Sequence, residues 1–211
     1  MKKIVSFALI MILGTCVLTG CSKDNKKEEK KSDTVEISYT LGNGIIKVSV
    51  PKDKDGNPKY DFTEEKPEGI SVSKTFYLVT DNTMIGFSTS GFSYHTSSKY
   101  KEKYGDVKAS FDGYLNFIED TDLFDKSYLP GLEQFKINER NALRYYNRAG
   151  GSGDYKYYGY FYMVGVDDIY PGSKLDIVVN YKEEEQSKES KEFDNETLEI
   201  IKSLKVVANQ K

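Results

Sequence analysis

The sequence has no tryptophan, a single histidine and two cysteines in 211 residues. Structural and catalytic zinc sites take several His or Cys ligands, so a chain whose only histidine is His95 is not expected to form one. His95 also lacks an assignable serine or cysteine partner for nucleophilic catalysis, and we interpret it as a strand or surface residue. We therefore expect no metal cluster, no catalytic residue and no cofactor.

Arginine and net positive charge are also scarce. Lysine and arginine together number 30, but only Arg140, Arg144 and Arg148 are arginine, and the formal net charge is −3. Nucleic-acid binding usually needs a basic face. Nucleic acid is therefore not an expected partner.

Long apolar runs are absent except at the start of the chain. Met1-Lys2-Lys3 precedes Ile4–Leu18, which has the length of the hydrophobic region of a secretion signal and is too short to span a bilayer comfortably. The run ends in Leu18-Thr19-Gly20-Cys21, which resembles the bacterial lipobox. The resemblance implies removal of residues 1–20 and lipidation of the Cys21 sulfur with diacylglycerol. Membrane lipid is thus an expected partner, with the protein on the outer face of a bacterial membrane.

The segment after Cys21 has no apolar residue. Ser22–Asp33 mixes lysine with acidic residues, which favours a disordered tether over residues 21–33. A dozen flexible residues span roughly 20 Å. Since Cys16 would leave with the leader, no disulfide is expected. We predict one folded domain over residues 34–208 and a short tail at residues 209–211.

What the sequence does contain is strand patterning, most clearly between Glu139 and Tyr181. Here we predict a three-stranded antiparallel meander, with strands at Arg144–Arg148, Tyr155–Val166 and Leu175–Tyr181. In the last strand apolar residues alternate with Asp176, Val178 and Asn180, which predicts one buried face.

Three further segments have the same alternation. Val35–Thr40 and Ile45–Val50 predict a first hairpin, and Phe76–Thr80 and Met84–Thr89 a second one across Asp81-Asn82. Residues 91–95 are expected to extend or bulge the second hairpin. Leu132–Ile137 predicts another strand, which Asn138-Glu139-Arg140 turns into the meander.

Two helices are expected. Ser110 or Asp112 can cap a helix that places Tyr114, Phe117 and Ile118 on one face. A second helix is predicted to begin with Asp194 as N-cap and a staple between Phe193 and Leu198, after a loop over residues 182–192. It would bury Leu198, Ile201 and Leu204 and carry Lys202 and Lys205 near its C-terminal end.

These elements predict an α+β fold in which an antiparallel β-sheet is covered by helices; the alternative is a β-sandwich with an appended C-terminal helix. Three short stretches resemble the PsbP family: Val48-Ser49-Val50-Pro51, the segment Ile137–Ala142, and Ile200–Val206. The resemblance implies a PsbP-like α/β/α sandwich. It also implies an accessory or docking role, without catalytic residues to transfer.

The surface of unusual composition is an arginine and tyrosine face. Its candidate binding residues are Arg140, Arg144, Arg148, Tyr146, Tyr158 and Tyr160. The arginines lie four residues apart, so along a strand they project to one face, beside tyrosines of the next strand. Guanidinium groups stacked on tyrosine rings are the favoured interpretation. A forked site for a carboxylate or phosphate of a partner is the alternative.

Two acidic stretches are candidate cation sites. Oxygen ligands follow EF-hand spacing at Asp53, Asp55, Asn57, Asp61 and Glu64, but Pro58 stands where a calcium loop needs glycine. A plain Asp-Gly-Asn-Pro turn is therefore the favoured interpretation. Glu119, Asp120, Asp122 and Asp125 also crowd together, and a solvated acidic loop is favoured there.

The sequence thus favours a membrane-anchored extracytoplasmic lipoprotein whose domain binds an envelope protein or a ligand and is not an enzyme. The alternative is a cell-envelope glycan hydrolase that uses Asp and Glu carboxylates, since two such carboxylates leave no sequence signature. Glu119–Asp125 would be its candidate acids.

Overall fold

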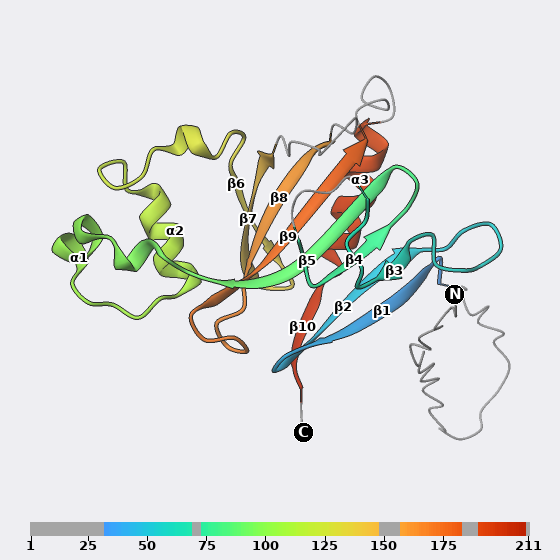
Figure 1. Cartoon of the computed structure of the whole chain (residues 1–211), viewed down its shortest axis with the longest axis horizontal. Coiled ribbons are helices and arrows are strands. Elements are labelled where there is room, and N and C mark those ends of the chain that lie inside the picture. Colours follow the sequence, from blue (N-terminus) through green and yellow to red (C-terminus); the bar gives the residue numbers. More distant parts are fainter. Residues whose placement is uncertain (1–31, 69–72, 148–156, 183–189, 210–211) are drawn as a thin grey trace, which may run out of the picture. The chain divides into compact units, whose positions relative to one another are not determined.

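The computed structural model describes residues 32–68, 73–147, 157–182 and 190–209 (Figure 1). Within these residues ten strands form two antiparallel sheets, with three α-helices and two short 3-10 turns. The predicted α+β class with antiparallel sheets and covering helices is confirmed. Cys21, the leader and most of the charged segment lie outside the described residues.

The larger sheet contains seven strands and includes the predicted meander. Its order is β3-β4-β5-β9-β8-β7-β6, every neighbouring pair being antiparallel. The bounds are β3 (Asp61–Thr63), β4 (Phe76–Val79), β5 (Thr83–Gly91), β6 (Glu133–Ile137), β7 (Arg140–Asn147), β8 (Tyr157–Gly165) and β9 (Ser173–Lys182). The second predicted hairpin is β4–β5, and β5 ends at Gly91 instead of running on to His95.

The smaller sheet contains the first predicted hairpin. β1 (Thr34–Leu41) pairs with β2 (Gly44–Pro51), and β2 pairs with β10 (Lys205–Ala208). Ile46, Val48 and Val50 of β2 are buried against one face of the larger sheet. We call this face, which carries Ile177 and Tyr162, the inner face. The packing of two sheets is the one feature that the β-sandwich alternative anticipated.

The β6–β7 turn needs an uncommon backbone. Asn138 and Glu139 have φ of 45° and 69°, and Ile137 pairs directly with Arg140. Two successive positive φ angles are typical of the tight hairpin turn that follows the strand twist, and asparagine tolerates them well. The Asn138 side chain also donates a hydrogen bond to the Leu204 carbonyl at 2.7 Å. This turn therefore joins the meander to the C-terminal segment.

The opposite face of the seven-stranded sheet, which we call the outer face, carries a smaller helical layer. After a 3-10 turn at Tyr94–Thr96, α1 (Ser98–Tyr104) and α2 (Phe111–Glu119) follow β5, and a second 3-10 turn spans Lys126–Tyr128. Phe111 and Ile118 of α2 are buried in a cluster with Leu143 and Met163 of the outer face. The predicted cap is confirmed, because the Ser110 hydroxyl accepts a hydrogen bond from the Gly113 backbone.

The C-terminal helix differs from its prediction at both ends. α3 spans Ser190–Lys202, so Asp194 lies inside the helix and is not its N-cap, and the side chain of Phe193, one half of the predicted staple, lies outside the described residues. Among the described side chains of α3, Thr197, Ile200 and Ile201 are buried, whereas Leu198 is only partly buried. Lys205 belongs to β10 and not to a helix end. Pairing with β2, which is distant in sequence, makes this short segment a strand.

β9 also differs from its prediction, because both of its faces are buried. It is the central strand of the larger sheet, and its residues Leu175 through Tyr181 are all buried. Asp176 and Asn180, expected to face solvent, are 6% and 2% exposed on the outer face. On this face Asp176 accepts a hydrogen bond from Ser90 of β5.

Candidate functional site

Arg140 holds the two sheets together. Its guanidinium donates to both carboxylate oxygens of Asp168 at 2.5 and 2.8 Å, and to the carbonyls of Gly165 and Val206, each at 3.1 Å. Gly165 ends β8 in the larger sheet, and Val206 lies in β10 of the smaller one. Four hydrogen bonds to the chain itself leave little of this planar donor for a partner. Arg140 therefore has a structural role.

Arg144 has partners of its own. Its guanidinium carbon lies 4.8 Å from the centre of the Tyr160 ring, and Nε donates to Glu133 at 2.8 Å. This is the stacking that the sequence favoured, a cation-π contact worth about 0.5 to 1 kcal/mol at an exposed site. Glu133 thus supplies one carboxylate oxygen to this guanidinium, and a forked site for a partner's anion stays a prediction.

Of the β8 tyrosines, the structure describes the side chains of Tyr160 and Tyr162, and both contact the core. Tyr162 is fully buried on the inner face, and Tyr160 packs against the same core. The rings of Tyr146 and Tyr160 meet edge to face at a centroid distance of 6.0 Å. Arg148 and the side chain of Tyr158 lie outside the described residues. The structure therefore brings Arg144, Tyr146 and Tyr160 together and separates Arg140 from them.

The residues with EF-hand spacing form a turn. Asp53 Oδ1 accepts hydrogen bonds from the backbone amides of Asp55 and Asn57 at 2.9 and 2.8 Å, which is typical of an Asx turn. Asp61 lies in β3, beyond the isolated pairing of Lys52 with Pro58. In the described part of the chain, no three His, Cys, Asp or Glu side chains gather as they would around a metal ion.

The acidic stretch after α2 is held by ordinary local contacts. Asp120 accepts from Tyr104 and pairs with Lys103, each at 2.7 Å, and hydrogen bonds from Lys103 and Tyr104 lower its pKa. Asp125 caps the turn at Lys126–Tyr128, and the Ser127 backbone amide lowers its pKa. A glycosidase acid needs the opposite, a raised pKa.

A polar cluster that the sequence did not predict lies on the outer face where β5 pairs with β9. Ser90 donates to Asp176 Oδ2 at 2.5 Å and accepts from Lys174 Nζ at 2.6 Å. Lys174 Nζ is also 3.4 Å from Asp176 Oδ1. The side chains of Lys174 and Asp176 are 12% and 9% exposed, so this ion pair is largely withdrawn from water.

Lys74 is a second ammonium group beside this pair. Its Nζ donates to Ser88 at 3.1 Å and lies 5.2 Å from the centre of the Phe161 ring. Across the β5–β9 ladder, Ser88 is directly opposite Asp176. No carboxylate forms an ion pair with Lys74 among the described residues. Burial lowers the pKa of Lys74; nearby Asp176 raises it, and Lys174 lowers it further.

Aromatic rings border the cluster. Phe161 stacks on Tyr145 at a centroid distance of 5.4 Å, and Lys174 Nζ is 5.4 Å from the centre of Phe92. Burial, together with the charges of Tyr114 and Asp176, raises the pKa of Tyr145 to about 12. Phe161 and Tyr145 are only partly buried, so the edge of this aromatic wall reaches solvent. We call Lys74, Ser88, Ser90, Lys174 and Asp176 the lysine cluster.

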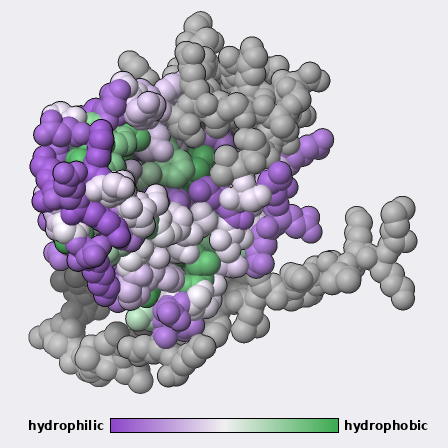
Figure 2. All heavy atoms as spheres, turned by 60° about the vertical axis from the view of Figure 1, so that its left-hand side comes forward, coloured by the Kyte–Doolittle hydropathy of each residue, from purple (hydrophilic) through white to green (hydrophobic). Residues whose placement is uncertain are grey.

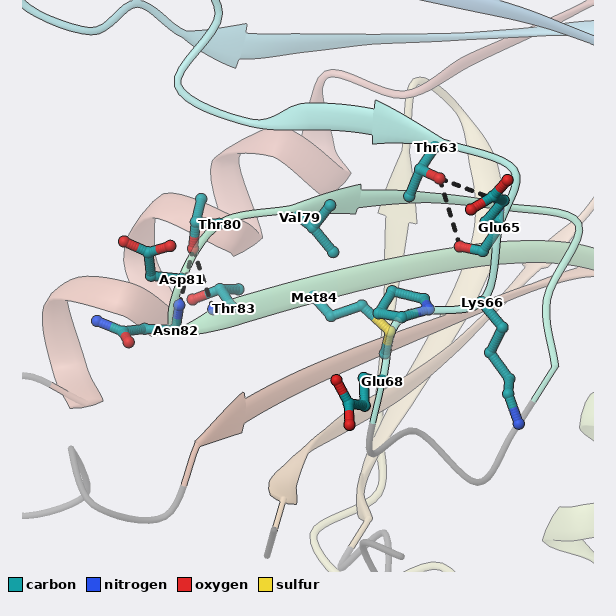
Figure 3. Close-up of a pocket in the computed structure, with 11 residues that line it drawn as sticks. Thr63, Glu65, Lys66, Glu68, Val79, Thr80, Asp81, Asn82, Thr83 and Met84 are labelled. Carbon is teal, nitrogen blue, oxygen red and sulfur yellow. Dashed lines mark hydrogen bonds between the residues drawn. The ribbon is translucent and has the colours of Figure 1, made fainter. Parts of the chain in front are cut away.

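A cavity of about 520 Å³ is lined by residues of β3, β4, β5 and the segments that follow β3 and β4 (Figure 3). Its apolar side is Val79 and Met84, which belong to the same apolar cluster as Phe161, and its polar side is the segment Glu65–Glu68 and the β4–β5 turn. In Figure 3, dashed lines show Thr63 bonded to Glu65, and Thr80 bonded to the amides of Asn82 and Thr83. The cavity therefore has walls fixed by local hydrogen bonds.

The surface around these features is mixed in polarity. Seen from the side of α1 and α2, hydrophilic residues dominate and hydrophobic ones surface in separate patches (Figure 2). Among the described residues, no helix is both long and apolar enough to cross a bilayer.

Comparison with known proteins gives few matches. No family model matches the chain, and no curated protein does. Among solved structures, the solution structure of cyanobacterial PsbP (CyanoP) from Synechocystis sp. PCC 6803 is similar at 13% sequence identity, with a TM-score of 0.43. The similarity covers 92% of this chain and 99% of that one. At this TM-score the similarity bears on neither function nor site, and the fold class rests on the sheets and helices described above.

Proposed function

We propose that this protein is a lipid-anchored extracytoplasmic lipoprotein with a PsbP-like domain that binds a ligand or an envelope protein and performs no catalysis. The observation that carries the anchor is Leu18-Thr19-Gly20-Cys21 at the end of a short apolar run. Cys21 is the thiol that accepts the lipid, and the charged segment up to Asp33 holds the domain off the bilayer. The folded strand β1 starts directly after that segment, at Thr34.

The anchor is tested by labelling the full chain with a radioactive fatty acid in a bacterial host and separating detergent and aqueous phases. Cys21→Ser should abolish labelling, because serine cannot form the thioether, and should leave an unlipidated precursor that detaches from the membrane or is processed differently there. Cys16→Ser is the matched control and should change neither labelling nor partition. Labelling that survives Cys21→Ser would refute the lipid anchor.

Two features support binding over catalysis. The acids at Asp120 and Asp125 have lowered pKa values and are engaged by Lys103, Tyr104 and a backbone amide, which suits an ionised capping role. The lysine cluster, in contrast, holds two ammonium groups against one carboxylate on a partly open sheet face. A surplus of partly buried positive charge beside aromatic rings suits the binding of an anion.

Catalysis by the acidic stretch has a direct test. Purified full chain is incubated with peptidoglycan, and release of soluble sugar is compared with that of Asp120→Asn and Asp122→Asn. We expect no turnover above a buffer control for any of the three proteins. Turnover by the unmodified chain that either substitution removes would replace binding by glycan hydrolysis.

A further inference from the structure

We propose that the lysine cluster binds the carboxylate of a small organic anion. Lys74 is the principal contact, and the apolar part of the ligand packs on the ring of Phe161. This inference deepens the proposed binding function and rests on it. It is carried by the placement of Lys74, the charge balance and the adjacent rings.

The Lys74 side chain occupies the space that the missing side chain of Gly86 leaves on β5. A Cβ atom at Gly86 would lie 2.8 Å from Lys74 Cγ and 3.1 Å from the Tyr77 ring, so only glycine lets the lysine stem lie flat on β5. At the other end of the residue, the Lys74 backbone amide donates to Tyr77 Oη at 2.7 Å. These contacts fix the position of the Lys74 ammonium group over the outer face.

The charges around that place do not balance. Lys174 is matched by Asp176 at 3.4 Å, and Ser90 bridges the two. Among the described residues, Lys74 Nζ contacts a neutral hydroxyl and the face of a ring and forms no ion pair, so the lysine cluster itself has two ammonium groups and one carboxylate. Desolvating a cation without a counter-ion is unfavourable, and one bound anion would relieve it.

The net charge of the lysine cluster favours a carboxylate over a phosphate. A carboxylate carries one charge and matches the surplus, whereas a phosphate dianion would exceed it and meet Asp176 close by. Phosphate sites also draw on arginine forks or helix N-termini, and none of the cluster residues supplies either. Serine hydroxyls can donate to a carboxylate oxygen, and Phe161 with Tyr145 offers a flat apolar surface.

The ladder register places the described cavity next to this position. Met84 of β5 lines the cavity, and Gly86 lies two residues further along β5 on the same face. Gly86 pairs with Val178 of β9, and Val178 pairs on its other side with Phe161 of β8. Two residues of a strand advance about 7 Å. A ligand whose carboxylate contacts Lys74 can therefore extend its apolar body over Phe161 toward the cavity.

The test uses the full chain in nonionic detergent with benzoate as probe, followed by NMR and calorimetric titration. Benzamide is the neutral match, and inorganic phosphate is the second anion. We expect benzoate to bind, benzamide to bind about tenfold more weakly or not at all, and phosphate to be the weaker anion. Lys74→Met should reduce benzoate affinity about tenfold or more, while Lys99→Met, at an exposed helix lysine, should leave it unchanged.

Ser88→Ala keeps the charge of the lysine cluster and removes only one hydroxyl, so it is a second test of the binding site if Lys74→Met unfolds. It should weaken benzoate binding with little change in melting temperature. No benzoate binding, equal binding of benzamide, or full affinity in Lys74→Met would each overturn the carboxylate site. Such a result would leave the lipid anchor standing, because fatty-acid labelling of Cys21 reports on that separately.

Discussion

Replacing Arg140 by methionine is the sharpest test of how the two sheets are joined. Methionine keeps much of the side-chain length but donates no hydrogen bond, so the Gly165 and Val206 carbonyls and the Asp168 carboxylate lose their partner. Each carbonyl left without a donor costs about 1 kcal/mol, at the low end of the usual range because water can reach this partly exposed site. The half-exposed pair with Asp168 adds about 0.5 to 1 kcal/mol.

Together these losses predict that Arg140→Met lowers the free energy of unfolding by about 3 kcal/mol, or the melting temperature by roughly 6 to 12 °C. Thermal unfolding followed by circular dichroism measures this. Lys136→Met, at an exposed position of β6, is the control and should change stability by less than about 0.5 kcal/mol. If the two variants melt at the same temperature, Arg140 does not join the sheets as described.

Three further outcomes are expected. The Arg140 hydrogen bonds lower the pKa of Asp168 below its ordinary 3.8. The Asp168 carboxylate therefore stabilises the fold above that pH, and this stabilisation is lost as the pH falls through the folded-state pKa. Thermal melts of Asp168→Asn and the unmodified chain should differ near neutral pH and converge in strong acid. Glu139→Gly should raise stability by roughly 0.5 to 1 kcal/mol in denaturant titrations, because φ of 69° is strained for glutamate, and a decrease would refute this interpretation of the turn. Arg144→Met should lower stability by about 1 to 2 kcal/mol, since it removes the Tyr160 and Glu133 contacts together, and a melt unchanged from the unmodified chain would contradict a structural role.

Local sequence signals predicted the hairpins and α2 well. The β1–β2 and β4–β5 turns, the Asn138-Glu139 turn and the Ser110 cap each depend on a few neighbouring residues whose preferences agree with the fold. The stacking of Arg144 on Tyr160 was also within reach, because β7 and β8 are joined through the predicted meander and their register follows from it.

The wrong predictions concern segments whose structure or burial depends on contacts with distant parts of the chain. Lys205–Ala208 is a strand because it pairs with β2, about 160 residues earlier along the chain, and nothing within four residues signals this. Asp194 resembled a helix start, but α3 begins before it at Ser190. Asp176 and Asn180 resembled a solvent-facing row, yet β9 is central and its second face is covered.

The lysine cluster was invisible for the same reason. Lys74, Ser88 and Lys174 meet only through the β5–β9 pairing and the path of the chain before β4. The one local signal was Gly86 inside an otherwise apolar strand, since such a glycine often marks the close approach of another part of the chain.

The proposed lipid anchor is tested most directly by the intact mass of the chain extracted from bacterial membranes. We expect a single species that starts at Cys21 and carries diacylglycerol on its sulfur. A chain that retains Met1, or that starts elsewhere with an unmodified Cys21, would contradict it.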